Sequence, residues 1–133
     1  MEERGRGADL PILIVEDDPA GAKLLAVVLA DEGCPVRVAH TAEEALLILR
    51  SYRPRAILLD LVLPTMSGVM LAGLVRQDPV HHDVPIIAVT SLNGAMGERI
   101  ALEAGCTAYV RKPVDALEFF PLLLTHLQEK KRA

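Results

Sequence analysis

Short apolar runs alternate along the chain with longer stretches in which apolar residues recur at helical spacing. The apolar runs have the length of β-strands and end at turn residues; they cover residues 10–15, 35–39, 55–60, 84–90 and 107–110. Stretches with helical periodicity follow them at residues 19–32, from 41 onward, and at 67–77, 95–104 and 115–128. The pattern predicts five consecutive β–α units, without an internal repeat and without a linker.

Capping residues mark where several of these helices begin. Asp18 precedes a proline and is typical of an N-cap, and Gly33 supplies the matching stop. Thr41 and Glu44 have the spacing of a capping box, and Asp115 is placed to cap the last helix. These signals support the helix positions that the apolar periodicity predicts.

Strands that alternate with helices of this length pair in parallel through right-handed crossovers. The run at 10–15 and the residues between Arg55 and Asp60 in the run at 55–60 are apolar throughout, as strands covered on both faces must be. The runs at 35–39 and 107–110 are shorter and more polar, which suits the edges of a sheet. We therefore expect an α/β fold with an open, doubly wound five-stranded parallel sheet in the order 2-1-3-4-5. The domain is expected to span residues 10–128, with flexible tails at 1–9 and 129–133.

Composition narrows the possible functions. The 133 residues are 51% hydrophobic, and the aromatic residues are two Tyr and two Phe with no Trp, so there is little from which to build a stacking platform for bases or sugars. The formal charge of −4 argues against direct nucleic-acid binding, which needs clustered Lys and Arg. No run approaches the length of a membrane span, and the polar residues 1–9 contain no apolar region that could act as a signal peptide. We expect a cytoplasmic protein that does not insert into a membrane.

The two cysteines, Cys34 and Cys106, precede the two predicted edge strands. Four strand spacings of about 4.8 Å place those edges roughly 19 Å apart, which is far beyond the reach of a disulfide. We expect two free thiols and no native disulfide.

The predicted carboxyl edge of the sheet gathers polar side chains from four strands. Glu16 and Asp17 follow the first strand, Asp60 follows the third, Thr90 ends the fourth and Lys112 follows the fifth. In open parallel sheets this edge is where ligands bind. Three crowded acids repel one another unless a hard cation such as Mg²⁺, which prefers oxygen ligands, neutralises them. Together with an ammonium suited to a phosphoryl group, these are the parts for phosphoryl transfer to a carboxylate.

Four segments together resemble the response-regulator receiver domain of bacterial two-component signalling. They are Ile14–Pro19, Leu58–Pro64 with Gly68, Ile86–Ser91 and Gly105–Pro113. Each segment alone is a weak signal, but all four in this order and at these spacings are highly specific, and the resemblance covers about residues 10–128. It implies a CheY-like, flavodoxin-type (βα)5 fold, in agreement with the strand order derived above.

The resemblance also assigns roles at the carboxyl edge. It implies that Asp60 is the phosphoacceptor and, together with Asp17 and the backbone carbonyl of Val62, a direct ligand of Mg²⁺, for which Mn²⁺ can substitute. Glu16 would hold the metal through water. Lys112 would pair with the phosphoryl group.

Other positions are assigned to switching and support. Thr90 is implied to be the switch hydroxyl that binds a phosphoryl oxygen, and Tyr109 the aromatic residue whose rotamer follows it. Pro113 would follow a cis peptide bond. Ser91 is small enough to leave room for the phosphoryl group, and Gly68 would support the site.

By this resemblance the protein is a phosphorylation-dependent switch, and not an enzyme beyond its own phosphotransfer and dephosphorylation. The phosphoryl group would come from a sensor histidine kinase or a histidine phosphotransfer protein, pass to Asp60 in a Mg²⁺-dependent reaction, and then go to water. The signal would leave through the surface of the fourth helix, fifth strand and fifth helix, toward an unknown downstream protein. We expect a monomer or a weak phosphorylation-dependent dimer.

Three positions are less typical of the family. Val62 and Leu92 are apolar and bulky, and each stands two residues after Asp60 or Thr90. We expect them to shield the acyl phosphate from water. Pro121 lies within the last predicted helix, where it should bend or delay the helix and weaken an interface built on it.

Two pairs of neighbouring residues carry further expectations. Phe119 and Phe120 stand beside the proline of the last helix, and one is expected to face the core while the other contributes to a docking patch. His81 and His82 lie in a polar loop. We expect both histidines to be solvated rather than to bind a metal.

Rival interpretations share parts of this pattern. A flavodoxin-type FMN binder has the same fold, but the acids at 16–18 would repel its phosphate. A phosphatase or phosphotransferase with an Asp nucleophile is expected to carry a second acid where Val62 stands. A pseudo-receiver that acts only as an interaction module would lack part of the acid–Thr–Lys set, which is complete here. The chain could also be a receiver module excised from a larger regulator or hybrid kinase, although Met1 and the charged tail favour a whole protein.

Overall fold

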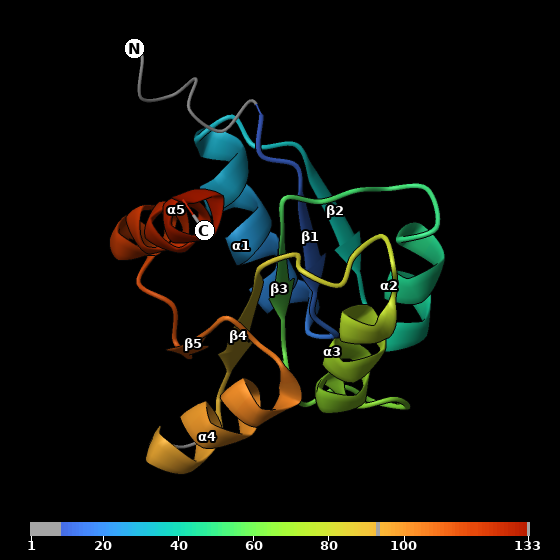
Figure 1. Cartoon of the computed structure of the whole chain (residues 1–133). Helices are drawn as coiled ribbons and strands as arrows, with labels where there is room; N and C mark the ends of the chain where they lie inside the picture. The colour runs from blue at the N-terminus through green and yellow to red at the C-terminus, as the bar shows by residue number, and fades with distance from the viewer. Residues whose placement is uncertain (1–8, 93, 133) are drawn as a thin grey trace.

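The computed structural model describes residues 9–92 and 94–132, and only the backbone of residues 128–132. Strands and helices alternate along this part of the chain (Figure 1): β1 (Ile12–Val15), α1 (Pro19–Asp31), β2 (Val36–Ala39), α2 (Ala42–Ile48), β3 (Ala56–Leu59), α3 (Gly68–Gln77), β4 (Ile86–Thr90), α4 (Gly94–Ala104), β5 (Ala108–Arg111) and α5 (Ala116–Arg132). The strands form one parallel sheet in the order β2-β1-β3-β4-β5, which confirms the predicted fold. None of the helices described is long and apolar enough to span a membrane.

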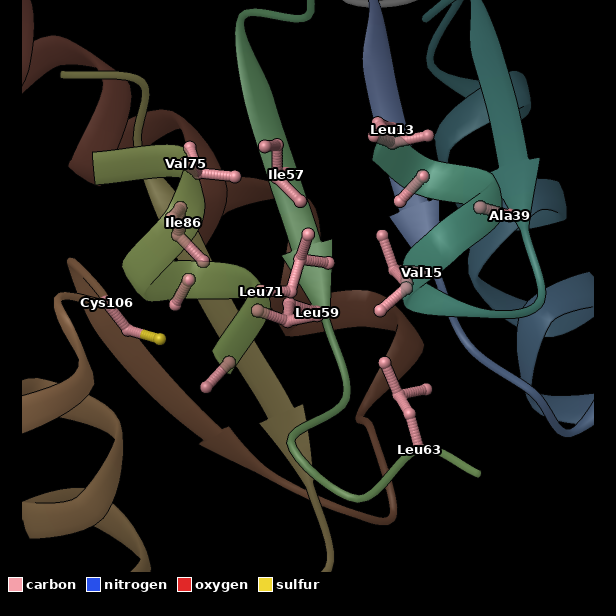
Figure 2. Packing of buried hydrophobic residues seen from close by; sticks show 14 of the residues in the cluster. Leu13, Val15, Ala39, Ile57, Leu59, Leu63, Leu71, Val75, Ile86 and Cys106 are labelled. Atoms are coloured by element: carbon pink, nitrogen blue, oxygen red, sulfur yellow. The ribbon is translucent and has the colours of Figure 1, made fainter. Parts of the chain in front are cut away.

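The sheet separates two apolar clusters. Helices α1 and α5 lie side by side on one face, and α2, α3 and α4 cover the other (Figure 1). Because successive residues of a strand point to opposite faces, Ile12 and Ile14 of β1 join the cluster that includes α1 and α5, whereas Leu13 and Val15 join the other. Figure 2 shows the second cluster, in which the sheet packs against α2 and α3. Each fully buried aliphatic side chain contributes roughly 1.5–3 kcal/mol of transfer free energy.

Side-chain caps start the first two helices where the sequence predicts them. Oδ2 of Asp18 accepts a hydrogen bond from the N–H of Gly21 at 2.9 Å, and Oγ1 of Thr41 accepts one from the N–H of Glu44 at 3.0 Å. The Glu44 carboxylate accepts a hydrogen bond from the N–H of His40 at 2.7 Å. In the usual capping box the donor would be the N–H of the N-cap residue, which is one position later. The polar groups of the first turn of α2 therefore also hold the end of β2.

The last helix differs in detail from the expectation. It begins directly after Asp115, whose carboxylate accepts hydrogen bonds from the first turn, so Pro121 does not delay it. The helix continues past Gln128, where the sequence pattern predicts its end, because neither Gly nor Pro follows to stop it. Of the predicted tails, residues 1–8 and 133 lie outside the described residues.

Two expectations about neighbouring residues are wrong. Phe119 and Phe120 are both buried, at 2% and 1% exposure, because the apolar stripe of a helix is wide enough to include adjacent positions. Neither side chain is therefore available for a docking patch. His81 is buried rather than solvated, because its Nε2 lies 2.9 Å from the carbonyl oxygen of Leu49 at the end of α2, a partner that makes burial of the ring tolerable. His82 is exposed, as predicted.

The two cysteines are free and buried on opposite faces of the sheet. Cys34 belongs to the cluster that includes α1 and α5, and Cys106 to the cluster that includes α2 and α3. Burial raises the pKa of each thiol to about 11, with the nearby Glu32 carboxylate adding to the effect at Cys34. The pair thus behaves as small apolar core residues.

Candidate functional site

The register of the sheet places three charged residues one step beyond the last paired positions. The N–H groups of Glu16, Asp60 and Lys112 each donate to the carbonyl of the last residue of a neighbouring strand, at 2.9, 3.0 and 2.9 Å. The hydrogen-bond ladder therefore continues through these residues and fixes their backbones at the carboxyl edge. Residues far apart in sequence meet there because the parallel strands end at the same edge.

Lys112 joins two carboxylates that come from different strands. Its Nζ donates to Oε1 of Glu16 and, at 3.0 Å, to Oδ2 of Asp60. Glu16 and Asp60 are almost completely buried, at 2% and 7% exposure, and Lys112 is partly buried. The ammonium thus supplies a positive charge directly beside the carboxylate that the sequence marks as the phosphoacceptor.

The charges of this cluster shift one another's pKa values. Burial raises the pKa of Glu16, and the hydrogen bonds from Lys112 and from the Asp18 N–H only partly oppose that rise. Burial by itself lowers the pKa of Lys112, but its hydrogen bonds to the carboxylates of Glu16 and Asp60 outweigh burial, so that its pKa lies above the ordinary value. Lys112 therefore remains a cation throughout the neutral range.

The carboxylate oxygens form a group that fits a hard cation. One oxygen each from Glu16, Asp17 and Asp60 lie within 4.8 Å of one another, and Asp17 is exposed while the other two are buried. Oxygen ligands, few of them carboxylates, and an open side for water are what Mg²⁺ prefers. The donor set therefore fits the predicted magnesium ion.

The backbone next to Asp60 is closely packed. The N–H of Val62 donates to Oδ1 of Asp60 at 3.0 Å, so this peptide lies against the carboxylate; a metal-binding role for the Val62 carbonyl stays a prediction. The N–H of Gly68 donates to the carbonyl of Leu61 at 3.0 Å, and a Cβ at Gly68 would stand 2.3 Å from the carbonyl oxygen of Asp60. Glycine is needed here because the start of α3 touches the backbone of the predicted phosphoacceptor.

The two predicted switch residues meet at one backbone segment. Thr90 is fully buried at the end of β4, and its Oγ1 accepts a hydrogen bond from the N–H of Leu92 at 3.4 Å. Tyr109 is partly buried in β5, and its hydroxyl donates to the carbonyl of Leu92. Both hydroxyls are therefore bound to the main chain of Leu92, in the segment that leads into α4.

The remaining predicted positions are close neighbours in sequence of Lys112, Thr90 and Asp60. The peptide bond between Lys112 and Pro113 is cis, as the resemblance implies. Ser91 is exposed, next to the buried Thr90. Val62 is 55% exposed beside Asp60. Its proposed shielding of a phosphoryl group stays a prediction.

The interpretation of the sequence missed one residue that touches the site. His40 directly follows β2, and its Nδ1 lies 3.0 Å from the main-chain carbonyl of Glu16. The signal was available, because a residue that directly follows a parallel strand lies at the carboxyl edge of the sheet by position alone. The sequence pattern did not mark His40, because no acidic residue follows β2 to draw attention to this strand end.

Known proteins share the sequence family and the fold of this chain. The family model "Response regulator receiver domain" matches residues 12–123. An uncharacterized 14.6 kDa protein of Leptolyngbya boryana is 40% identical over 87% of this chain and 88% of its own length. The DNA-binding response regulator MtrA of Mycolicibacterium smegmatis is 34% identical over 90% of this chain. The chain spans about half the length of MtrA, 51%.

Solved structures show the same architecture. A putative response regulator from Chloroflexus aurantiacus superposes with a TM-score of 0.86 at 33% identity, covering 90% of this chain and 98% of the other. The receiver domain of the sensor histidine kinase PA1611 from Pseudomonas aeruginosa, solved with a magnesium ion coordinated in its active-site cleft, superposes with a TM-score of 0.82 at 30% identity, over 90% of this chain and 98% of that domain. The family-model match and these structural neighbours show that the chain belongs to the response-regulator receiver domain family.

Proposed function

We propose that the protein is a phosphorylation-dependent signalling switch in which Asp60 accepts a phosphoryl group from a phosphohistidine. The observation that carries this proposal is the position of Lys112, whose ammonium contacts the carboxylate of Asp60 within a group of three carboxylates. In the transfer, the P–N bond of the phosphohistidine breaks as a bond forms from phosphorus to a carboxylate oxygen of Asp60. The donor imidazole keeps the electron pair and takes up a proton. Water later attacks phosphorus, the bond from phosphorus to the Asp60 oxygen breaks, and inorganic phosphate leaves as the Asp60 carboxylate is restored.

The surrounding residues have two roles in this reaction, charge stabilisation and metal binding. Lys112 holds its charge beside the oxygen of Asp60 and stabilises negative charge that develops on the phosphoryl group. Asp17 and Asp60, with the Val62 carbonyl and with Glu16 through water, would hold Mg²⁺ or Mn²⁺. When bound, the ion neutralises charge on the phosphoryl oxygens. The magnesium ion in the receiver domain of PA1611 supports this assignment.

The output would be a change in packing near α4. A phosphoryl group carries about −1.5 to −2 charges and strong acceptor oxygens, and because it replaces the −1 charge of the Asp60 carboxylate, the crevice gains about one negative charge. If the Thr90 hydroxyl turns to such an oxygen, it gives up its long bond to Leu92, the residue that also binds Tyr109. Moving a two-state equilibrium from mostly off to mostly on requires about 5.5 kcal/mol of differential interaction, which several charge-assisted hydrogen bonds supply. The signal would leave through the surface of α4, β5 and α5.

The proposed setting is the cytoplasm, where a sensor histidine kinase or a histidine phosphotransfer protein is the donor and an unknown protein is the target. The protein would act as a monomer or a weak phosphorylation-dependent dimer. Its only catalysis would be its own phosphotransfer and dephosphorylation. A pseudo-receiver is the alternative that the test below must separate.

Incubation with Mg²⁺ and a small phosphodonor such as acetyl phosphate tests the proposal directly. Mass spectrometry should show the gain of one phosphoryl group, which Asp60→Asn and chelation of the metal both abolish. Asp83→Asn, at an exposed aspartate outside the site, is the matched control and should leave the gain unchanged. A phosphoryl gain that survives Asp60→Asn would refute Asp60 as the acceptor. No gain in the wild-type protein would favour the pseudo-receiver.

A further inference from the structure

We propose that His40 is a positioning residue for the cation-binding turn, acting through the main-chain carbonyl of Glu16. This inference rests on the proposed function, because it concerns the turn that carries Asp17. The contact joins the ends of two neighbouring strands: Nδ1 of His40, just after β2, lies 3.0 Å from the carbonyl oxygen of Glu16, just after β1. A carbonyl oxygen can only accept, so Nδ1 carries the proton and donates.

The hydrogen bond acts on Asp17 through the planarity of the peptide. The carbonyl of Glu16 and the nitrogen of Asp17 belong to one rigid plane, so a donor that fixes this carbonyl also restricts where the Asp17 side chain starts. Asp17 is the exposed member of the carboxylate group and has less packing around it than the buried Glu16 and Asp60. His40 therefore supplies an anchor at the point where burial does not.

The N–H of Glu16 and its carboxylate are tied to Ala39 and Lys112, but both contacts lie before the Glu16 carbonyl in the chain or on the side chain. The side-chain hydrogen bonds that follow in the turn are local. The N–H of Asp18 donates to Oε2 of Glu16 at 3.1 Å, and the N–H of Gly21 donates to Oδ2 of Asp18 at 2.9 Å. Both bonds link residues two or three positions apart and would move with the turn. The bond from His40 spans 24 positions and ties the turn to the next strand.

His40 is itself held in place by the start of α2. Its backbone N–H donates to Oε1 of Glu44 at 2.7 Å, and the N–H of Glu44 donates to Oγ1 of Thr41 at 3.0 Å. A chain of hydrogen bonds therefore runs from the first turn of α2, through His40, to the turn that carries Asp17. His40 is exposed, but its backbone is fixed in this way, so only its side-chain torsions must be ordered when Nδ1 binds the carbonyl.

Calorimetric titration of the full chain with Mg²⁺ alone, at a pH near 8 and without a phosphodonor, tests the inference. His40→Ala should weaken Mg²⁺ binding about three- to tenfold, the size expected for one lost hydrogen bond. His40→Asn should restore binding to within about twofold of wild type, because its amide nitrogen stands as many bonds from the backbone as Nδ1 and also donates. His82→Ala, at an exposed histidine away from the site, should have no effect.

A second measurement works without any metal. The backbone amide resonance of Asp17 should shift in His40→Ala and return toward its wild-type position in His40→Asn, as seen by NMR of the metal-free protein. Unchanged Mg²⁺ binding and an unchanged Asp17 resonance in His40→Ala would overturn the inference. So would a His40→Asn variant that folds normally but behaves like His40→Ala. If wild type itself fails to bind Mg²⁺, the proposed function fails, and the Asp17 resonance still decides whether His40 positions the turn.

Discussion

The hydroxyl of Tyr109 reaches the carbonyl of Leu92 through a space that exists only because residue 97 is glycine. A Cβ built on Gly97 would stand 2.9 Å from the Tyr109 hydroxyl and 2.8 Å from the carbonyl oxygen of Leu92. Gly97 lies in α4 and is buried, so an added methyl group would have to displace one of these two neighbours. The position of the tyrosine hydroxyl therefore depends on residue 97 having no Cβ.

Replacing Gly97 by Ala should push the Tyr109 hydroxyl off Leu92. We expect a net loss of about 1–2 kcal/mol in the free energy of unfolding, because overpacking outweighs the better helix propensity of alanine. Tyrosine fluorescence in a Tyr52→Phe background would report the displacement of Tyr109. Gly73→Ala is the matched control, since nothing lies within 4 Å of its added Cβ. An unchanged Tyr109 signal in Gly97→Ala would count against the contact.

Gly68→Ala should be the more damaging glycine substitution. Its Cβ would fall 2.3 Å from the carbonyl oxygen of Asp60 and 2.7 Å from the Cα of Leu61, and these backbone atoms cannot move aside as a flexible side chain can. We expect a loss of about 3 kcal/mol or more in urea unfolding, together with weaker phosphorylation of Asp60. Gly73→Ala on the same helix should instead be neutral or stabilising by up to about 1 kcal/mol. Equal unfolding midpoints for the two variants would refute the close approach.

Removing the ammonium of Lys112 should change how stability depends on pH. Burial already places the pKa of folded Glu16 above its unfolded value of 4.5, so the native state binds the proton more tightly and the free energy of unfolding falls as the pH rises from about 4.5 through the folded pKa. In Lys112→Met the opposing hydrogen bond is gone, and the pKa of Glu16 should rise further. The fall should therefore be larger and extend to higher pH.

Chemical denaturation of the metal-free protein between pH 4 and 8 measures this effect. Adding Glu16→Gln to Lys112→Met should remove most of the extra pH dependence, because the titrating carboxyl is gone. A pH profile of Lys112→Met that overlays the wild-type profile would show that the ammonium does not stabilise the charged form of Glu16.

Val62→Asn should shorten the lifetime of the phosphorylated protein several-fold. Val62 is 55% exposed, and its N–H already touches the Asp60 carboxylate, so a polar side chain there could bring water to the acyl phosphate. Loss of phosphate after removal of the donor can be followed by intact-protein mass. Val80→Asn replaces another exposed valine, far from the site in a loop after α3, and should have no effect. An unchanged rate of phosphate loss in Val62→Asn would refute the shielding hypothesis.

The two thiols should be almost inert in the folded protein. With a pKa of about 11 against an ordinary 9.0, the thiolate fraction of each at pH 8 is about a hundredfold lower than in an unfolded chain, and burial slows access further. Alkylation by iodoacetamide should therefore be at least about a hundredfold slower in buffer than in denaturing urea. The raised pKa values also mean that the free energy of unfolding falls as the pH rises from 9 to 11. Rapid labelling of either cysteine in the folded state would contradict its burial.

The sequence was enough to predict what depends on strand order and strand ends. Glu16 and Asp60 follow uninterrupted apolar runs, and in a doubly wound parallel sheet such positions meet at one edge. Lys112 could be added because the last strand also ends there. The contacts that the structure shows between these three residues follow from backbone register, which local pattern specifies well.

Features that depend on a distant partner could not be predicted. His81 looked solvated because its neighbours are polar, and only the carbonyl of Leu49, 32 positions earlier, makes its burial favourable. Phe119 and Phe120 looked divided between core and surface because the width of the buried stripe on α5 depends on how closely the helix packs against the sheet. Gly97 carries no local signal at all, since its role is to leave room for a hydroxyl from β5.

The salt contacts of Lys112 also set the electrical balance of the crevice. Three carboxylates and one ammonium, all ionised, sum to a formal charge of −2. A monovalent ion would leave this balance negative and a trivalent ion would reverse it, whereas a divalent ion brings it to neutrality. Phosphorylation then replaces the single negative charge of the Asp60 carboxylate by the charge of the phosphoryl group, about −1.5 to −2, so the crevice with its ion carries about −1. The phosphorylated crevice would therefore differ by only about one charge from the metal-free crevice and from the ion-loaded crevice. A partner that reads the state would have to recognise where the charge lies, through shape and hydrogen bonding, more than its total.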